Sequence, residues 1–125
     1  RAIFASGSPF DAVTLNGRTL RPGQGNNAYI FPGVGLGVVA CGLTRVTGSM
    51  LAAAARALAE QVSAEDIAEG RIYPRLSRIR AVSVHIAAAV AEVGYANGLA
   101  ARPRPADLLA HIRAVVYEPG YPAWT

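Results

Sequence analysis

Two adjacent asparagines, Asn26 and Asn27, are the side chains in this chain best suited to holding a polar ligand. An asparagine amide offers both a hydrogen-bond donor and an acceptor. The pair follows Gly25 in a glycine-rich stretch, residues 23–37, and glycine lets the backbone approach a ligand closely. A simple turn ahead of an apolar helix would explain the same residues. Two interpretations of the pair therefore stay open, a ligand contact and a turn.

A second candidate contact lies close to the N-terminus. Residues 2–5 form a short apolar run, and Ser6, Gly7 and Ser8 follow it. A continuous apolar run that ends in Gly, Ser and Pro is typical of a buried parallel strand and its loop. Ligands bind beyond the C-terminal ends of strands in open α/β sheets. Gly7 and both serine hydroxyls are therefore candidate contacts, although this piece alone favours an ordinary strand-to-loop turn.

The chain lacks the residues of several common catalytic sites. All twelve basic residues are arginines, so no lysine of this chain can act as an acid, a base or a Schiff-base former. The sequence has no zinc-type Cys/His spacing, no P-loop, no nucleophile elbow and no metalloprotease motif. Glu65 and Glu69 share a helical spacing that a solvated acidic face explains, and His85 is expected to be structural. His111 lies on the expected last helix without the matching Asp and Ser of a catalytic triad beside it in the sequence.

Composition indicates one small folded domain. The chain has 125 residues, of which 52% are apolar, and its longest apolar runs are too short for a membrane span. The net charge of +4 comes from scattered arginines, which leaves an Arg-rich nucleic-acid binder as one alternative. The single Cys41 is expected to be a buried, inert thiol in a reducing, intracellular setting. Because the chain begins at Arg1 without a methionine, we expect an internal piece of a longer protein.

The expected elements are a short strand, a small hairpin and several helices. Asn16-Gly17, between residues 13–15 and 18–20, predicts a hairpin with a type I′ turn. Apolar spacing and capping residues predict helices over residues 33–43, 48–62, 64–69, 74–96 and 105–118.

Within these helices, particular residues carry particular expectations. Thr47 and Ser63 are expected N-caps, Pro74 and Pro105 are expected in the first turns of the last two helices, and Gly94 is a candidate interruption. One helix face is expected to hold Arg71, Arg75 and Arg78, and it is interpreted as solvated, with an anion or partner patch as the alternative. The expected packing or interface residues near the C-terminus are Tyr117, Tyr121 and Trp124.

Three sequence blocks resemble the C-terminal portion of the long-form malic enzymes. They are Ala-Ser-Gly-Ser-Pro-Phe at 5–10, Gly-Gln-Gly-Asn-Asn-Ala-Tyr-Ile-Phe-Pro-Gly at 23–33 and Glu-Gly-Arg-Ile-Tyr-Pro at 69–74. The resemblance covers essentially the whole chain, and the first two blocks are specific in their order and spacing.

The resemblance implies a fold and a reaction. The fold would be mainly α with a short N-terminal strand and hairpin, as the C-terminal fragment of an α/β, Rossmann-containing multidomain enzyme. Residues 1–26 would end the dinucleotide-binding domain, residues 27–100 would return into the substrate domain, and residues 101–125 would form a small C-terminal helical segment. The reaction would be oxidative decarboxylation of L-malate to pyruvate and carbon dioxide, with NAD or NADP and a Mg or Mn ion that polarises the C2 oxygen.

The resemblance assigns roles to few residues of this chain. Asn26 and Asn27 would bind malate, and Gly7, Gly25 and Asn27 would contact the nucleotide. The catalytic residues and the metal ligands would lie upstream of Arg1, so the fragment alone would be inactive. The implied partners are malate, the remainder of the enzyme and copies of itself in a dimer or tetramer, with no nucleic acid, no membrane and a cytoplasmic location. The alternative is a non-enzymatic helical interaction module.

Overall fold

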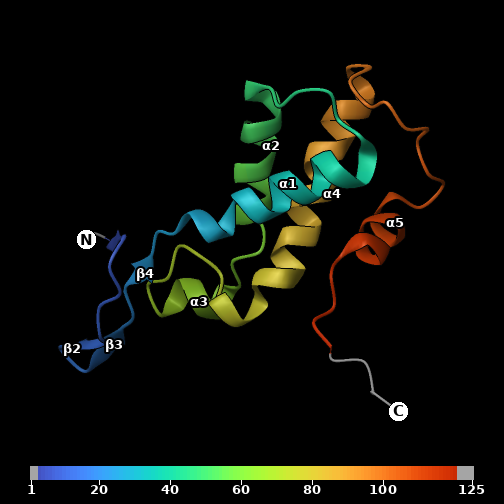
Figure 1. Cartoon of the computed structure of the whole chain (residues 1–125). Coiled ribbons are helices and arrows are strands. Elements are labelled where there is room, and N and C mark those ends of the chain that lie inside the picture. Colours follow the sequence, from blue (N-terminus) through green and yellow to red (C-terminus); the bar gives the residue numbers. More distant parts are fainter. Residues whose placement is uncertain (1–2, 121–125) are drawn as a thin grey trace, which may run out of the picture.

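The computed structural model describes residues 3–120 and divides into an N-terminal arm and a helical body (Figure 1). The arm holds the four strands of the described residues, and the body holds the longer helices. A mainly helical chain with a few short strands, as predicted from the sequence, is confirmed.

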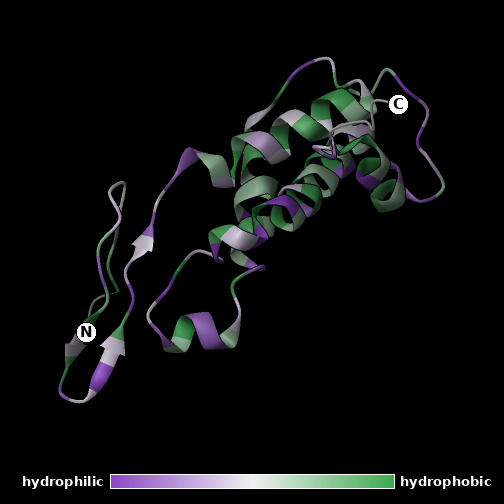
Figure 2. Ribbon diagram, turned by 60° about the horizontal axis from the view of Figure 1, so that its bottom comes forward, coloured by the Kyte–Doolittle hydropathy of each residue, from purple (hydrophilic) through white to green (hydrophobic). Residues whose placement is uncertain are grey.

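Two pairs of short strands build the arm. β1 (Ala5–Ser6) pairs in parallel with β4 (Gly23–Gln24), which places Ala5 opposite Gly23. β2 (Val13–Leu15) and β3 (Arg18–Leu20) form an antiparallel hairpin that projects from the body (Figure 2). The predicted turn is confirmed, because Asn16 and Gly17 have φ values of 51° and 72°, as a type I′ turn requires.

The predicted burial of the first strand is wrong for part of its apolar run. Ile3 and Phe4 are 55% and 56% exposed, and β1 itself starts only at Ala5. The reason is that, in the part of the chain described, β1 has only the two-residue β4 beside it.

The helical body is organised around its longest helix, α4 (Ile79–Ala96). Three further helices pack against α4: α1 (Phe31–Cys41), α2 (Gly48–Ala59) and α5 (Leu108–Val115). The single-turn helix η1 (Asn27–Tyr29) precedes α1, while the short helix α3 (Ala64–Ala68) and the single-turn helix η2 (Leu76–Arg78) lie between α2 and α4. Met50, Ile86 and Ile112 are fully buried where these helices meet.

Two glycines let α1 approach α4 closely. A Cβ atom at Gly33 would lie 2.6 Å from Cβ of Ile86, and one at Gly37 would lie 2.9 Å from the carbonyl oxygen of Ala87. Both distances are shorter than real Cβ contacts, so only glycine fits at this crossing. The predicted helix thus exists, but it ends at Cys41, where Gly42 takes the left-handed conformation with φ 63°.

Several predicted helix boundaries hold. Thr47 caps α2 by accepting a hydrogen bond from the Met50 N–H, and Ser63 caps α3 by accepting one from Asp66. Gly94 is buried inside α4 and does not interrupt it.

Two predicted helix starts are wrong. Pro74 lies outside any helix, because its carbonyl accepts a hydrogen bond from the Tyr29 hydroxyl and Arg75 is extended. The last helix begins at Leu108 and not at Pro105, because the Asp107 carboxylate caps it.

The correction at Pro74 also removes the predicted arginine face. Arg71 and Arg75 precede the helices η2 and α4, and Arg78 is the residue that joins them. Arg71 and Arg75 pair with acidic residues of α3 and its C-cap, whereas Arg78 donates to the carbonyl of Gln61.

One expectation about membranes needs correction. By length and composition alone, the segment Leu76–Ala96 could cross a membrane. Its apolar face, however, is covered by α1 and α2, so in this structure it is the central helix of the body.

Outcomes differ for the remaining single residues. Cys41 is buried, as expected. Nε2 of His111 lies 3.0 Å from the carbonyl oxygen of Ala40. His85 is half-buried in α4. Tyr117 is 79% exposed, so it does not pack within the described chain. Tyr121 and Trp124 lie outside the described residues.

Candidate functional site

The pairing of β1 with β4 brings the two predicted ligand-contact regions together. The Gly25 N–H donates to the Ser6 carbonyl at 2.7 Å, and the Gln24 side-chain amide donates to the Gly7 carbonyl at 3.1 Å. Gly7 and Gly25, which lie 18 residues apart in the sequence, therefore stand at the same end of the parallel pair. A Cβ atom at Gly7 would meet no atom within 4 Å, so the backbone there is open to a ligand.

Asn26 has a structural role as well as free hydrogen-bonding capacity. Its Oδ1 accepts a hydrogen bond from the Ala28 N–H at 2.9 Å and so caps η1. Within residues 3–120 its Nδ2 group has no acceptor and is left as a donor, and the residue is exposed. Asn26 can therefore offer hydrogen-bond donors to a ligand, which suits a carboxylate oxygen.

Asn27 is the first residue of η1 and is also exposed. Among residues 3–120, its side chain makes no hydrogen bond that would engage its amide. Asn27 thus retains both a donor and an acceptor, and the loop carries two exposed amides at consecutive positions.

Two tyrosines lie against this loop, and the sequence reasoning missed both. Tyr29 is buried, donates its hydroxyl to the Pro74 carbonyl at 2.7 Å, and has a raised pKa because of its burial. Its ring stacks on the ring of Tyr73, with centroids 5.3 Å apart and an angle of 14° between the planes. Both tyrosines belong to the sequence blocks quoted above, but no local sequence pattern predicts that their rings stack.

A cavity of about 410 Å³ lies beside the loop. All three sequence blocks line it, through Phe10 of the first, Gln24 and Tyr29 of the second, and Arg71 and Tyr73 of the third. The structure therefore brings the three blocks to one place, although none of them is adjacent to another in the sequence.

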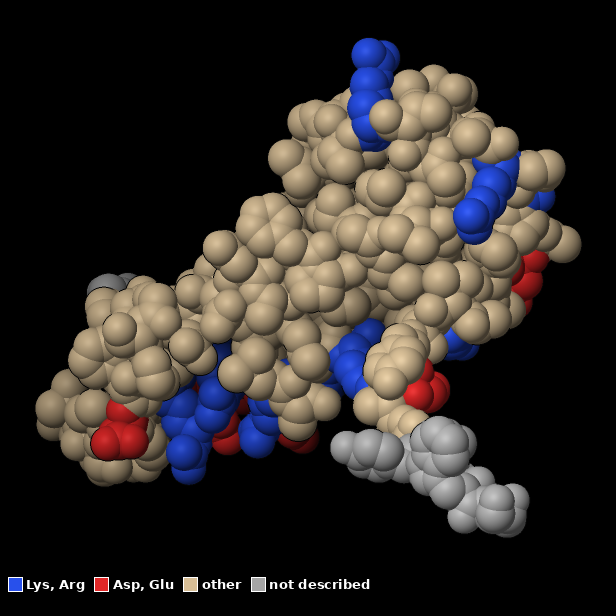
Figure 3. Space-filling model, viewed as in Figure 1, with Lys and Arg blue, Asp and Glu red and all other residues tan. Residues whose placement is uncertain are grey.

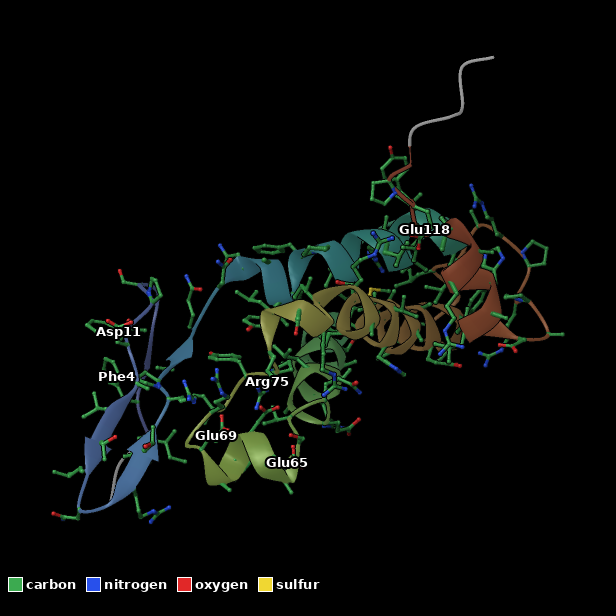
Figure 4. The ribbon with its side chains drawn as sticks, turned by 90° about the horizontal axis from the view of Figure 1, so that it is seen from below. Phe4, Asp11, Glu65, Glu69, Arg75 and Glu118 are labelled. Atoms are coloured by element: carbon green, nitrogen blue, oxygen red, sulfur yellow. The ribbon has the colours of Figure 1, made fainter. Side chains whose placement is uncertain are left out.

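A cluster of charged side chains lies between the arm and α3, next to this cavity. Figure 3 shows basic and acidic side chains gathered between the arm and the body. Arg71 Nε lies 3.1 Å from Glu69 Oε2, and Arg75 Nε lies 3.1 Å from Asp66 Oδ1. Glu69 and Arg75 are neighbours where α3 faces the arm (Figure 4). Arg21 extends the cluster to the arm, with its Nε 3.7 Å from Glu69.

Asp66 is the buried member of this cluster. Burial raises the pKa of its carboxyl, but hydrogen bonds from Ser63 and Arg75 and the charge of Arg75 outweigh that effect and hold it below its usual value of 3.8. Asp66 is thus a carboxylate at neutral pH. Glu65 remains exposed, as predicted, whereas Glu69 joins the ion pairs.

The described residues hold no group of three or more His, Cys, Asp and Glu side chains that could bind a metal ion. Asp66 and Glu69 are engaged by arginines, so they have the wrong surroundings for a cation.

Comparison with known proteins identifies the family. Residues 1–95 match the family model described as "Malic enzyme, NAD binding domain". The chain belongs to the malic enzyme family. This model extends across the boundary predicted near residue 26, and the division of the chain into domains remains a prediction.

Individual malic enzymes are similar over almost the whole chain. The NADP-dependent malic enzymes of Populus trichocarpa, Anas platyrhynchos and Homo sapiens are 57%, 54% and 51% identical to it, over 122, 123 and 123 residues. Each comparison covers 97% of this chain but only 21% or 22% of the relative. The chain thus spans about a fifth of the length of these relatives.

Proposed function

We propose that this chain is part of a malic enzyme that oxidatively decarboxylates L-malate to pyruvate and carbon dioxide. The observation that carries the proposal is the identity of 51% to 57% with NADP-dependent malic enzymes over 97% of the chain. The names of these relatives favour NADP over NAD as the nucleotide.

Within this proposal, Asn26 and Asn27 hold malate. Both amides are exposed on a loop that the arm and the body support from two sides. Because Oδ1 of Asn26 is already engaged, this residue contributes N–H groups, which complement a malate carboxylate without adding a charge. Asn27 can bind malate, the nucleotide or both.

Gly7, Gly25 and Asn27 are proposed to contact the nucleotide, which would accept a hydride from C2 of malate. The open space at Gly7 and the exposure of Gly25 fit a ligand that lies against the backbone. The direct N–H to carbonyl contact between Gly25 and Ser6 fixes the two segments relative to each other, so a ligand would meet a rigid surface.

The proposed Mg or Mn ion needs ligands from outside the described residues, since these residues offer no suitable cluster. The division at residues 26 and 100, assembly into a dimer or tetramer, and a cytoplasmic location belong to the same proposal. The single, buried Cys41 agrees with a reducing compartment. Because the metal and the proton-transfer groups would come from the remainder of the enzyme, we expect the chain alone to be inactive.

The test is an assay of the full-length protein that contains this chain. We expect malate-dependent reduction of NADP, with formation of pyruvate, only when Mg or Mn is present, and slower reduction of NAD. Residues 1–125 expressed alone should give no turnover under the same conditions. A full-length protein without turnover of malate would overturn the proposal and favour the helical interaction module.

A further inference from the structure

The side chain of Tyr73 touches the candidate site loop on both sides of the two asparagines. On the N-terminal side, a Cβ atom at Gly23 would lie 3.3 Å from Tyr73 Cδ2, and one at Gly25 would lie 3.6 Å from the Tyr73 hydroxyl oxygen and 3.7 Å from Cε2. On the C-terminal side of the asparagines, the Tyr73 ring stacks on the ring of Tyr29, with 5.3 Å between the ring centroids. Asn26 and Asn27 therefore lie in a short span of backbone whose two ends contact the same aromatic ring.

Tyr73 comes from a segment that is itself held firmly. Arg71 and Arg75, two residues away on either side, pair with Glu69 and Asp66. The next residue, Pro74, is buried and accepts the hydroxyl of Tyr29. Since Tyr73 is flanked by these contacts, its ring is a fixed support for the loop.

The ring of Tyr73 makes most of its contacts with the loop, and the hydroxyl adds one close approach at Gly25. In the part of the chain that the structure describes, the Tyr73 hydroxyl has no hydrogen-bond partner, whereas the Tyr29 hydroxyl has one. The stacking on Tyr29 and the contact with Gly23 both involve ring carbons. A phenylalanine would keep these ring contacts and lose only the approach of the hydroxyl to Gly25.

We propose that Tyr73 is a positioning residue for malate binding, whose ring holds the Gly23–Tyr29 loop so that the Asn26 and Asn27 amides face the ligand. The inference rests on the proposed function, because the asparagines act on malate only within it. Tyr73 does not touch the ligand in this account. Its effect passes through the backbone of Gly25 and through Tyr29.

The experiment compares Tyr73→Phe, Tyr73→Leu and Tyr73→Ala in the full-length enzyme. We expect Tyr73→Phe to keep the KM for malate within about twofold of wild type, while Tyr73→Leu and Tyr73→Ala raise it at least about fivefold with a smaller change in kcat. A residue that only stabilises the fold would lower the amount of active enzyme and leave KM unchanged. Tyr73→Leu retains apolar volume and serves if Tyr73→Ala does not fold.

Tyr95 provides a matched control. It is also half-buried, and its hydroxyl donates to the carbonyl of Pro103 at 3.3 Å, but it lies near the far end of α4. We expect Tyr95→Ala to lower the melting temperature and to leave the KM for malate within about twofold of wild type.

The results separate this inference from the proposed function. If wild-type enzyme turns over malate and Tyr73→Leu keeps the wild-type KM, the positioning role is refuted and the proposed function stands. If Tyr73→Phe raises KM as much as Tyr73→Ala, the hydroxyl and not the ring is responsible, and the inference is equally refuted. Wild-type enzyme without turnover of malate would overturn both.

Discussion

Nε of Arg75 lies 3.1 Å from Oδ1 of Asp66, and this ion pair ties the Tyr73–Pro74 segment to the short helix α3. The aspartate side chain is only 3% exposed, whereas that of the arginine is 49% exposed. A short helix of five residues has little stability of its own, so the pair and the Ser63 cap are what hold it in place.

Replacing Asp66 by asparagine should destabilise the chain. Asp66→Asn keeps the shape of the side chain but removes the charge that faces Arg75. Because hydrogen bonds to charged groups are worth about 1.5–3 kcal/mol, we expect the free energy of unfolding to fall by about that amount. Chemical denaturation of the chain measures it. Glu65→Gln is the control, because Glu65 is an exposed acid in the same helix and its replacement should change stability by less than about 0.5 kcal/mol.

The same carboxylate predicts how stability depends on pH. The pKa of Asp66 in the folded chain lies below its ordinary value of 3.8, so in this pH range the folded chain binds fewer protons at Asp66 than the unfolded chain does. The stabilisation from Asp66 should therefore be complete above about pH 5 and be lost as the pH falls through the folded pKa. The difference in unfolding free energy between wild type and Asp66→Asn should shrink between pH 5 and about pH 2. A constant difference over that range would contradict the assignment.

The crossing of α1 and α4 gives a prediction with an internal control. Gly37→Ala would place a methyl group 2.9 Å from the backbone oxygen of Ala87, which cannot move without shifting α4. We expect a loss of about 1–3 kcal/mol in the free energy of unfolding. Gly35→Ala, in the same helix, meets no atom within 4 Å and should stabilise the chain by about 0.5–1 kcal/mol. If both variants had the same stability, the close approach of the helices would be refuted.

Local rules explain what the sequence could predict. The hairpin at Asn16-Gly17 and the caps at Thr47 and Ser63 depend on residues within a few positions of each other, and all three are present. The glycine-rich surroundings of Asn26 and the resemblance predict that it is a site residue, and this role stays a prediction. Its second role as the cap of η1 was not foreseen, because the single turn it caps has no apolar periodicity.

Contacts between distant residues explain what the sequence could not predict. Pro74 satisfies the local rule for a helix start, but the Tyr29 hydroxyl, 45 residues away, binds its carbonyl and holds it outside the helix. The stacking of Tyr29 on Tyr73 has the same character. Sequence spacing therefore located the loop, and only the fold shows what supports it.

The cap role of Asn26 and its proposed role in malate binding can be separated by substitution in the full-length enzyme. Asn26→Asp keeps an oxygen that can accept from the Ala28 N–H, so the cap and the melting temperature should be retained. It removes both N–H donors of the amide and adds a negative charge that would repel the malate carboxylate.

We therefore expect kcat/KM for malate to fall at least about tenfold in Asn26→Asp, since a lost hydrogen bond to a charged group is worth about 1.5–3 kcal/mol. Asn26→Ala should show a similar loss of kcat/KM together with a lower melting temperature, because the cap is also lost. Steady-state kinetics and thermal unfolding of both variants measure the two effects separately. Wild-type kcat/KM in Asn26→Asp would mean that Asn26 serves only as a cap, and Asn27 would then be the remaining candidate for the malate contact.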